Sequence, residues 1–360
     1  MKVKIYGAGS IGNHLSNASR ACGWSVDLVD SDPSALERTR TKIYPERYGV
    51  WDESIRLFES KNAPVGGYDL VMIGTPPESH VSLALSAVKE RPRAILVEKP
   101  FCTPDMKQAQ ELHDLARENN IPIFTGYDHV VGQASEKFSE LIHGVGEIET
   151  LDVEFREYWG GIFAAHPWLD GPSDSYLGFW NRAGGACSEH SHGINLWQHF
   201  AHVMGAGRVT EITGTLSYVS NENVEYDNLA FINLKTENGL VGRVVQDVVT
   251  SPPRKWARLQ GSEGYVELQC GYKAGVDAVF SGSSKAGAAE YMFPKTRPDD
   301  FIHELRHIAS HVGSNLGPSP ISIERGLETA LLIAAAHLSS REKRTVSIDY
   351  SAGYSLNALK

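Results

Sequence analysis

The sequence predicts an N-terminal α/β domain with a doubly wound parallel sheet and a C-terminal α+β domain with a mainly antiparallel sheet. Two observations predict this division. Over about the first 125 residues, short apolar runs alternate with helical patterns. After Gly126 longer runs follow, and several of them alternate apolar with polar residues. We therefore expect domains of residues 1–125 and 126–360.

Five strands are expected in the first domain. Each run is unalternating and four to six residues long, as strands buried on both faces of a sheet are. They lie at 3–6, 25–29, 69–73, 94–97 and 121–124. Between them, segments 77–89 and 104–119 carry apolar residues at helical spacing. Thr103, Pro104 and Asp105 form a good helix start, with a cap residue, proline and an acid in the first turn.

The second domain is expected to combine antiparallel strands with helices. Turn signals such as Glu237-Asn238-Gly239 and the segment 261–264 separate its apolar runs. The expected strands lie at 148–158, 209–219, 229–234, 240–249 and 257–268. The expected helices cover 189–204, 300–312 and 323–340.

Composition and charge exclude several classes of protein. With 41% hydrophobic and 22% charged residues, the chain has the balance of a soluble globular protein. A formal charge of −10 and the lack of a Lys/Arg run disfavour nucleic acid as a partner. The longest apolar run, 330–336, is too short to cross a membrane. Since no signal-peptide pattern is present and the four cysteines form no Cys-x-x-Cys pair, a cytoplasmic protein is expected.

A glycine-rich turn follows the first expected strand and opens a helical segment. The sequence Gly7-Ala8-Gly9-Ser10-Ile11-Gly12 matches G-x-G-x-x-G, in which the backbone can approach a pyrophosphate at a helix N-terminus. An acid that bonds the ribose hydroxyls belongs at the end of the second strand, where Asp30 stands. Because a carboxylate there repels a 2′-phosphate, NAD is favoured over NADP. The segment predicts a Rossmann domain whose cofactor contacts are Gly7, Gly9, Ser10, Ile11, Gly12 and Asp30.

Three further motifs carry a family resemblance. Two of them follow expected strands and read Thr75-Pro76-Pro77-Glu78-Ser79-His80 and Glu98-Lys99-Pro100. In the third, a glycine pair precedes an acid and a histidine, in the sequence Gly184-Gly185-Ala186-Cys187-Ser188-Glu189-His190-Ser191-His192. With the glycine-rich turn, they resemble the glucose–fructose oxidoreductase/inositol dehydrogenase (Gfo/Idh/MocA) family over nearly the whole chain. The resemblance implies an NAD(P)-dependent dehydrogenase that acts on the secondary alcohol of a sugar, cyclitol or related polyol. It also implies a homo-oligomer, a dimer or a tetramer.

The resemblance implies catalytic roles for Lys99 and His192, with Glu189 orienting the histidine or the substrate. The chemistry of these side chains agrees, since an imidazole titrates near neutrality and can take the hydroxyl proton. Lys99 can polarise or protonate the same oxygen, with its position fixed by Glu98 and Pro100. The resemblance places further cofactor contacts at Thr75, Pro76, His80, Glu98 and Lys99.

Substrate contacts are expected at Tyr127, His129, Trp180, Arg182 and Asn195. Many relatives have Asp ahead of the helix histidine and Asp three residues after it, and the corresponding positions here are Glu189 and Asn195. Relatives often show G-Y-N-H-R-F where residues 126–131 read G-Y-D-H-V-V, so the expected arginine is Val130. The segment 158–180 is rich in aromatic residues, whose flat rings offer sugars an apolar surface. A satellite core or a subunit contact is the alternative interpretation of that segment.

A competing motif lies near the C-terminus. Residues His303-Glu304-Leu305-Arg306-His307 spell H-E-x-x-H, in which two histidines on one helix face bind zinc and the glutamate acts as base. Glu324 or Glu328 would supply a third ligand. This zinc-hydrolase hypothesis leaves the glycine-rich turn unexplained, so no residue is assigned as a metal ligand.

A third hypothesis is a non-catalytic sensor that only binds NAD. The presence of both Lys99 and His192 argues against it.

Overall fold

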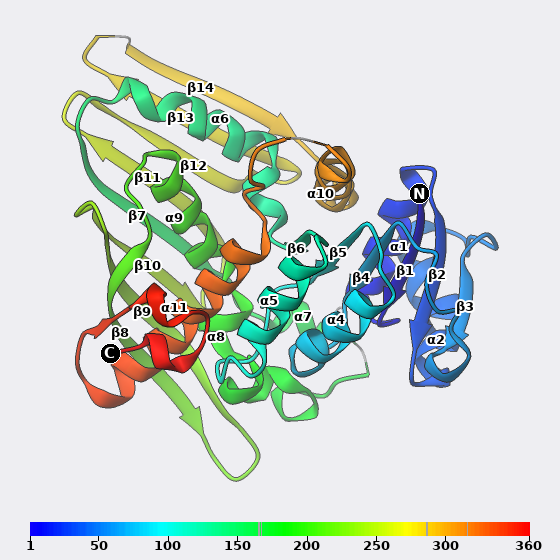
Figure 1. The fold of residues 1–360 in the computed structure, drawn as a ribbon. Coiled ribbons are helices and arrows are strands. Elements are labelled where there is room, and N and C mark those ends of the chain that lie inside the picture. Colours follow the sequence, from blue (N-terminus) through cyan, green and yellow to red (C-terminus); the bar gives the residue numbers. More distant parts are fainter. Residues whose placement is uncertain (165, 167, 286, 315) are drawn as a thin grey trace. The chain divides into compact units, whose positions relative to one another are not determined.

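The protein was analysed as a computed structural model that describes residues 1–360 except 165, 167, 286 and 315 (Figure 1). The chain divides into two structural units. The first consists of residues 1–102, 107–128 and 297–326, and the second of residues 103–106, 129–296 and 327–360. Among the described residues, we find no helix whose length and hydropathy would let it cross a membrane.

A six-stranded parallel sheet forms the centre of the first unit, in the order β3-β2-β1-β4-β5-β6. Its strands are β1 (Lys2–Tyr6), β2 (Ser25–Asp30), β3 (Arg56–Glu59), β4 (Leu70–Ile73), β5 (Ala94–Val97) and β6 (Ile123–Thr125). Every residue of β4 and β5 is buried, because helices cover both faces of a doubly wound sheet. The strand order changes direction between β1 and β4, where such sheets bind their ligands. The expected fold class is confirmed.

Helices surround this sheet, and in Figure 1 α4 and α5 run beside each other. The helices of the first unit are α1 (Ser10–Ala21), α2 (Pro33–Arg38), α3 (Tyr44–Tyr48), α4 (His80–Lys89), α5 (Ala109–Glu118) and α10 (Arg297–His311). The expected helix at 104–119 begins only at Ala109, so the prediction of a start at Pro104 was wrong. Met106 and Gln108 adopt positive φ values of 54° and 57°, which a helix does not allow.

The helix α10 belongs to the first unit, although it follows the second unit's strands in the sequence. Its buried face is formed by Phe301, Leu305 and Ile308, which recur at helical spacing. This face brings α10 against α1, the helix that follows the glycine-rich turn. A segment far along the chain therefore completes the covering of the nucleotide domain.

A nine-stranded sheet forms the second unit, in the order β14-β13-β12-β11-β7-β10-β9-β8-β15. Its longer strands are β7 (Ile148–Arg156), β8 (Val209–Ser220), β9 (Glu225–Thr236), β10 (Val241–Asp247), β11 (Arg254–Gly261), β12 (Gly264–Lys273), β13 (Val276–Ser283) and β14 (Gly287–Pro294), and β15 (Val346–Ser347) is short. Strands β7 and β10 pair in parallel, and the other neighbouring strands are antiparallel. The turn at 261–264 divides the expected strand 257–268 into β11 and β12. Strands β13 and β14 were not predicted, because many small residues obscure their alternation.

The second unit also contains helices. They are α6 (Gln133–Leu141), α7 (Gly160–Ala164), α8 (Gly185–Glu189), α9 (His192–Val203) and α11 (Ile323–Glu342), whose first turn still belongs to the first unit. Of these, α6, α8 and α9 contact the nine-stranded sheet. Figure 1 shows α6 lying along β12 and β13. The expected helix 189–204 is found as α9, which begins only at His192, and Glu189 instead ends the preceding helix α8. Helix α9 rests on β7 and β10, and Gly193 permits a close approach because a Cβ there would lie 3.3 Å from Phe155 Cβ.

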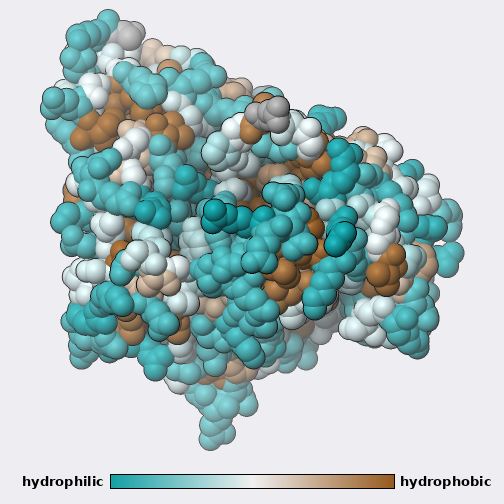
Figure 2. Space-filling model, viewed as in Figure 1, coloured by the Kyte–Doolittle hydropathy of each residue, from teal (hydrophilic) through white to brown (hydrophobic). Residues whose placement is uncertain are grey.

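The outer surface carries mainly polar side chains. Figure 2 shows hydrophilic residues over most of the face in view, with smaller hydrophobic patches between them. This distribution agrees with the formal charge of −10 and with the composition of a globular protein.

Candidate functional site

The predicted phosphate loop connects β1 to α1, and each of its glycines meets a different requirement. Gly7 has φ +99°, and a Cβ there would lie 2.7 Å from Gly74 O in the neighbouring loop. A Cβ at Gly12 would collide with Gly7 O, whereas one at Gly9 would meet no atom within 4 Å. Gly9 caps α1, whose first turn contains no acidic residue. The loop is thus closed on the protein side and open at Gly9, which leaves room for a pyrophosphate at the helix N-terminus.

Asp30 ends β2 with its carboxylate beside this loop. One carboxylate oxygen accepts a 2.7 Å hydrogen bond from Ala8 N–H, and the other accepts one of 2.9 Å from Asp32 N–H. Asn13 Nδ2 donates to Gly9 O at 2.7 Å from the opposite side of the turn. Since each carboxylate oxygen can accept further hydrogen bonds, Asp30 is held in place and can still bond a ribose diol. These residues fit the dinucleotide that the sequence predicts.

His80 joins the two motif loops that follow β4 and β5. Its ring is fully buried, with Nε2 2.7 Å from Thr75 O and Nδ1 3.0 Å from Pro100 O. Burial lowers the pKa of His80, and the hydrogen bonds to the backbone of Thr75 and Pro100 oppose this shift. The structure thus gives His80 the task of holding the Thr75-Pro76 loop against the loop after Lys99.

Glu98 and Lys99 directly follow β5. The Glu98 carboxyl is buried, and Gly126 makes room for it, because a Cβ there would lie 2.6 Å from Glu98 Oε2. Burial raises the pKa of Glu98, the charge of Asp128 raises it further, and the Lys99 ammonium opposes the rise. The buried acid therefore anchors the strand end from which the half-buried Lys99 extends.

In the H-E-x-x-H motif on α10, Glu304 is buried and His307 has a partner outside the motif. Glu304 is buried, and burial together with the Glu98 charge raises its pKa well above the usual range. His307 Nε2 lies 2.8 Å from Ser319 Oγ, and burial lowers the pKa of His307 to about 4. Within the described part of the chain, no group of three potential ligands includes these side chains. The structure gives the zinc-hydrolase hypothesis no support.

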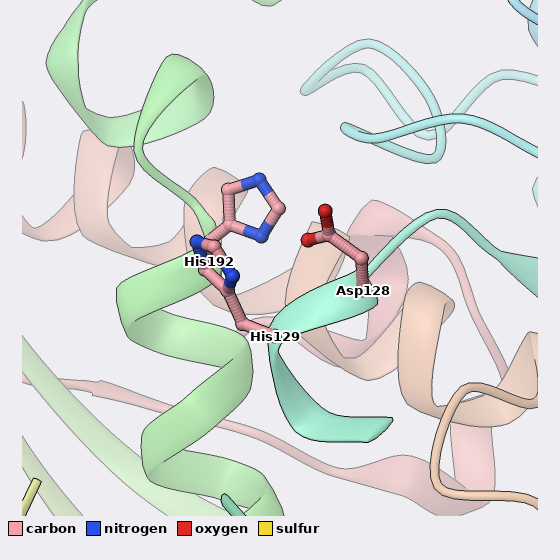
Figure 3. A group of neighbouring side chains, drawn as sticks. All are labelled: Asp128, His129 and His192. Atoms are coloured by element: carbon pink, nitrogen blue, oxygen red, sulfur yellow. The ribbon is translucent and has the colours of Figure 1, made fainter. Parts of the chain in front are cut away.

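In the second unit, His192 opens α9 and Glu189 ends α8. His129 lies on the 3-10 helix η4 (Asp128–Val131), and its ring centroid is 4.5 Å from that of His192. The ring of Phe155 on β7 lies 5.3 Å from His129 and 6.1 Å from His192. Figure 3 shows the two imidazoles together with Asp128, the residue just before His129 on the same turn. The candidate base is therefore part of a cluster that the sequence did not predict.

The glycine pair places the start of α8 on a buried acid. A Cβ at Gly184 would collide with the carbonyl oxygens of the preceding turn, and one at Gly185, where φ is +81°, would collide with the Asp227 carboxylate. Asp227 is fully buried on β9, and its Oδ2 accepts a 2.7 Å hydrogen bond from Cys187 N–H. Sequence analysis missed Asp227. Asp227 stands two residues before the expected strand 229–234, and nothing in the sequence reveals its partner.

The aromatic segment 158–180 divides between two environments, and its residues 165 and 167 lie outside the described residues. Trp159 and Tyr176 belong to an apolar cluster with Leu177, Ala186 and Val248, as in the satellite-core alternative. The ring of Trp180, in contrast, packs on His337 at 4.8 Å. The segment thus contributes to the core of the second unit.

The other expected substrate contacts have partners within their own units. Arg182 lies over the Phe179 ring at 5.3 Å. Asn195 is buried and donates a 3.0 Å hydrogen bond to Thr329 Oγ1, which links α9 to α11. Tyr127, just after β6, is 1% exposed. These contacts show what holds each side chain, and the substrate roles of these residues remain predictions.

The fold and the phosphate loop of the first unit are those of a dinucleotide-binding Rossmann domain. Residues 1–127 match the model of the GFO_IDH_MocA family, described as an oxidoreductase family with an NAD-binding Rossmann fold. The predicted Gfo/Idh/MocA resemblance is thus confirmed, with the match lying in the N-terminal domain. No curated protein sequence matches the chain.

Several solved structures share the fold over almost the whole chain. Levoglucosan dehydrogenase in complex with NADH has a TM-score of 0.77 at 17% identity, covering 97% of this chain and 99% of that chain. An oxidoreductase from Agrobacterium radiobacter in complex with NAD+, L-tartaric acid and magnesium has a TM-score of 0.75 at 20% identity, with 96% and 98% covered. The WlbA dehydrogenase from Bordetella pertussis, in complex with NADH and UDP-GlcNAcA, has a TM-score of 0.69 at 18% identity, with 97% and 98% covered. At these identities the likeness establishes the fold.

Proposed function

We propose that the protein is an NAD-dependent dehydrogenase that transfers hydride between the nicotinamide and a secondary alcohol or ketone of a sugar, cyclitol or sugar derivative. The observation that carries the proposal is the phosphate loop, which is open at Gly9 and has the Asp30 carboxylate beside it. The substrate class is supported by the names of structural neighbours, which include levoglucosan dehydrogenase in complex with NADH and L-sorbose.

The cofactor supplies the hydride chemistry at its nicotinamide ring when it is bound. The loop residues Gly7, Gly9, Ser10, Ile11 and Gly12 would hold the pyrophosphate through backbone N–H groups. Asp30 would bond the adenosine ribose and disfavour a 2′-phosphate. We assign the remaining cofactor contacts to the loops after β4 and β5 that carry Thr75, Pro76, Glu98 and Lys99, and the expected contact His80 would act by holding these loops together.

We assign to His192 the role of accepting the proton of the alcohol hydroxyl. An imidazole nitrogen accepts the hydroxyl proton during oxidation and returns it during reduction. The His129 and Phe155 rings that pack against His192 restrict its orientation. Glu189 stands three residues earlier at the end of α8, where its carboxylate can orient the imidazole or a substrate hydroxyl. Lys99 would donate a hydrogen bond to the reacting oxygen and stabilise the negative charge that develops there.

Substrate selection is assigned to Tyr127, His129, Trp180, Arg182 and Asn195. The guanidinium of Arg341 lies over the Trp180 ring, 4.9 Å from its centroid, and its N–H groups can donate to substrate hydroxyls. We further propose a cytoplasmic homo-oligomer, a dimer or a tetramer, and light scattering after size-exclusion chromatography measures this state.

A substrate panel tests the function. The purified chain is incubated with NAD and a set of free sugars, inositols, amino sugars and nucleotide sugars, and NADH formation is followed by absorbance. We expect turnover with at least one of these polyol classes and a lower rate with NADP. Binding of NAD without turnover of any member would overturn the dehydrogenase proposal and favour the NAD-binding sensor.

A further inference from the structure

The side chains of Asp128, His129 and His192 form a group with a potential common ligand. One carboxylate oxygen and two imidazole nitrogens all lie within 4.8 Å of one another, and no other such group of three occurs among the described residues. Asp128 and His129 are neighbours on η4, and His192 is the first residue of α9. Figure 3 shows the Asp128 carboxylate turned toward the two rings. The group therefore brings together three donors from two short stretches of backbone.

The donor set is selective in its chemistry. Two imidazoles with one carboxylate suit Zn²⁺ and the neighbouring divalent transition metals, whereas Mg²⁺ and Ca²⁺ prefer oxygen donors throughout. Ligand atoms around a tetrahedral zinc ion lie about 3.4 Å apart, as metal–ligand bonds of about 2.1 Å require. Since no two of these atoms are more than 4.8 Å apart, a pair must approach by at most about 1.4 Å, a movement within the range of side-chain rotation.

The backbone that carries these donors is well supported. Ser135 Oγ donates a 2.6 Å hydrogen bond to His129 O, and the buried side chains of Val130 and Val131 anchor the same turn. On the other side, Gly193 seats the first turn of α9 against Phe155. The buried Phe155 ring covers both imidazoles from one direction, which limits the access of water there. Such supported donors and an apolar shell are what a metal site needs to bind tightly.

We propose that Asp128, His129 and His192 bind one divalent transition metal ion of the zinc class. Three protein ligands leave a fourth position for water or, if the proposed function holds, for the hydroxyl oxygen of the alcohol substrate. With the ion bound, His192 would be a ligand in place of the proton acceptor proposed above, and the ion would stabilise the charge on that oxygen. The hydroxyl proton would then leave to solvent, because coordination to the ion lowers the pKa of the hydroxyl.

Direct metal binding tests this proposal without substrate or NAD. The untagged full-length chain is freed of metal with a chelator and titrated with Zn²⁺ by calorimetry and with Co²⁺ by visible absorption. We expect one ion per chain and a tetrahedral cobalt spectrum. His129→Ala and Asp128→Asn should each weaken binding by about 10-fold or more. Thermal unfolding and NAD binding of each variant verify that it is folded.

Two control variants identify the site. His199→Ala changes a residue on the same helix, α9, about two turns beyond His192, and this variant should leave the metal affinity unchanged. His303→Ala removes the first histidine of the H-E-x-x-H motif and should also have no effect. The proposal is overturned if no saturable binding occurs, if both site variants bind as the wild type does, or if His303→Ala abolishes binding instead.

The experiments can refute the metal proposal and the dehydrogenase proposal independently of each other. A chain that binds no ion but oxidises a polyol would leave His192 as the proton acceptor. A chain that binds one ion through His129 but turns over no polyol would retain the metal site and lose the assigned reaction.

Discussion

The Asp227 carboxylate accepts a 2.7 Å hydrogen bond from the backbone N–H of Cys187, and it thereby fixes the first turn of α8 to the large sheet. The same carboxylate occupies the space that a Cβ at Gly185 would need. A buried acid on β9 thus explains why a glycine is required just before the segment that carries Glu189 and His192. The position of these two side chains depends on a residue almost forty positions further along the chain.

Gly185→Ala should destabilise the protein more than substitution of an unconstrained glycine. The new Cβ would collide with Asp227, and φ +81° is unfavourable for alanine, so we expect a loss of about 2–4 kcal/mol in the free energy of unfolding. Gly161→Ala is a matched control, because a Cβ there meets no atom within 4 Å. Urea denaturation measures both. Equal stabilities of the two variants would show that Asp227 does not constrain this position.

The acid stability of the second unit should depend on His337 and Asp227 in opposite directions. Burial and the Arg341 charge lower the pKa of His337 to about 3, so its unfolded form gains a proton that its folded form lacks, and stability falls as the pH drops below about 6.5. Burial raises the pKa of Asp227 from 3.8 to about 7, so its folded form holds the extra proton, and stability rises as the pH falls from about 7 to 4. Tyr218, whose hydroxyl lies 2.7 Å from His337 Nδ1, and Cys187 face this pair.

Melting temperatures between about pH 7 and 4 measure these two contributions. His337→Gln should make the melting temperature less sensitive to acid than that of the wild type. Asp227→Asn should make it more sensitive, by several degrees over this range, because the opposing contribution is lost. Parallel curves for the wild type and both variants would contradict the assignment.

Gly9→Ala and Gly12→Ala should separate cofactor binding from folding. A Cβ at Gly9 enters open space, so the variant should melt within about 2 °C of the wild type, while its NAD affinity falls by about 10-fold or more because the pyrophosphate cannot approach. A Cβ at Gly12 collides with Gly7 O, so that variant should lose stability. Thermal melts and NAD titration by fluorescence distinguish the two. Unaltered NAD affinity in Gly9→Ala would place the pyrophosphate elsewhere.

Asp30→Ala should change the preference between the two nicotinamide cofactors. Loss of a charge-assisted hydrogen bond to the ribose should weaken NAD binding by about 10–100-fold, and loss of the negative charge should improve NADP relative to NAD. The measurement compares the affinities for NAD and NADP, because Asp30 also accepts a hydrogen bond from Ala8 N–H. Loss of that bond would loosen the loop and weaken the binding of both cofactors equally. Asp32→Ser, which keeps a capping side chain on α2, is the control. An unchanged NAD:NADP ratio would remove Asp30 from the ribose.

Lys99→Ala and His192→Ala should each lower kcat by about 10²–10⁴-fold while NAD binding remains. If both side chains act on one oxygen, the double variant should lose much less than the product of the single losses. Lys89→Ala, at the end of α4, and His199→Ala serve as controls for the removal of a lysine and a histidine. Steady-state kinetics with the best substrate of the panel provide the measurement. Wild-type rates in either single variant would remove that residue from the mechanism.

Local sequence determined much of the nucleotide-binding half. The glycine-rich turn, Asp30 and the apolar runs depend on neighbours in the chain, since turn chemistry and the two-residue or 3.6-residue periods are local properties. Four of the second unit's longer strands were predicted for the same reason. Where side chains are small, as in β13 and β14, the period carries little information and the strands were missed.

Only the tertiary structure decided which distant groups meet. The sequence alone permitted Glu304 to serve a zinc ion, but packing of Phe301 and Leu305 turns that carboxyl into the interior of the first unit. The same is true of Asp227 under the glycine pair and of Asp128 and His129 beside His192. A buried polar side chain must find a partner, yet that partner is chosen by the packing of whole helices and strands. The sequence by itself therefore determined the cofactor loop and the class of chemistry, and the tertiary structure determined the partners of the acids and histidines.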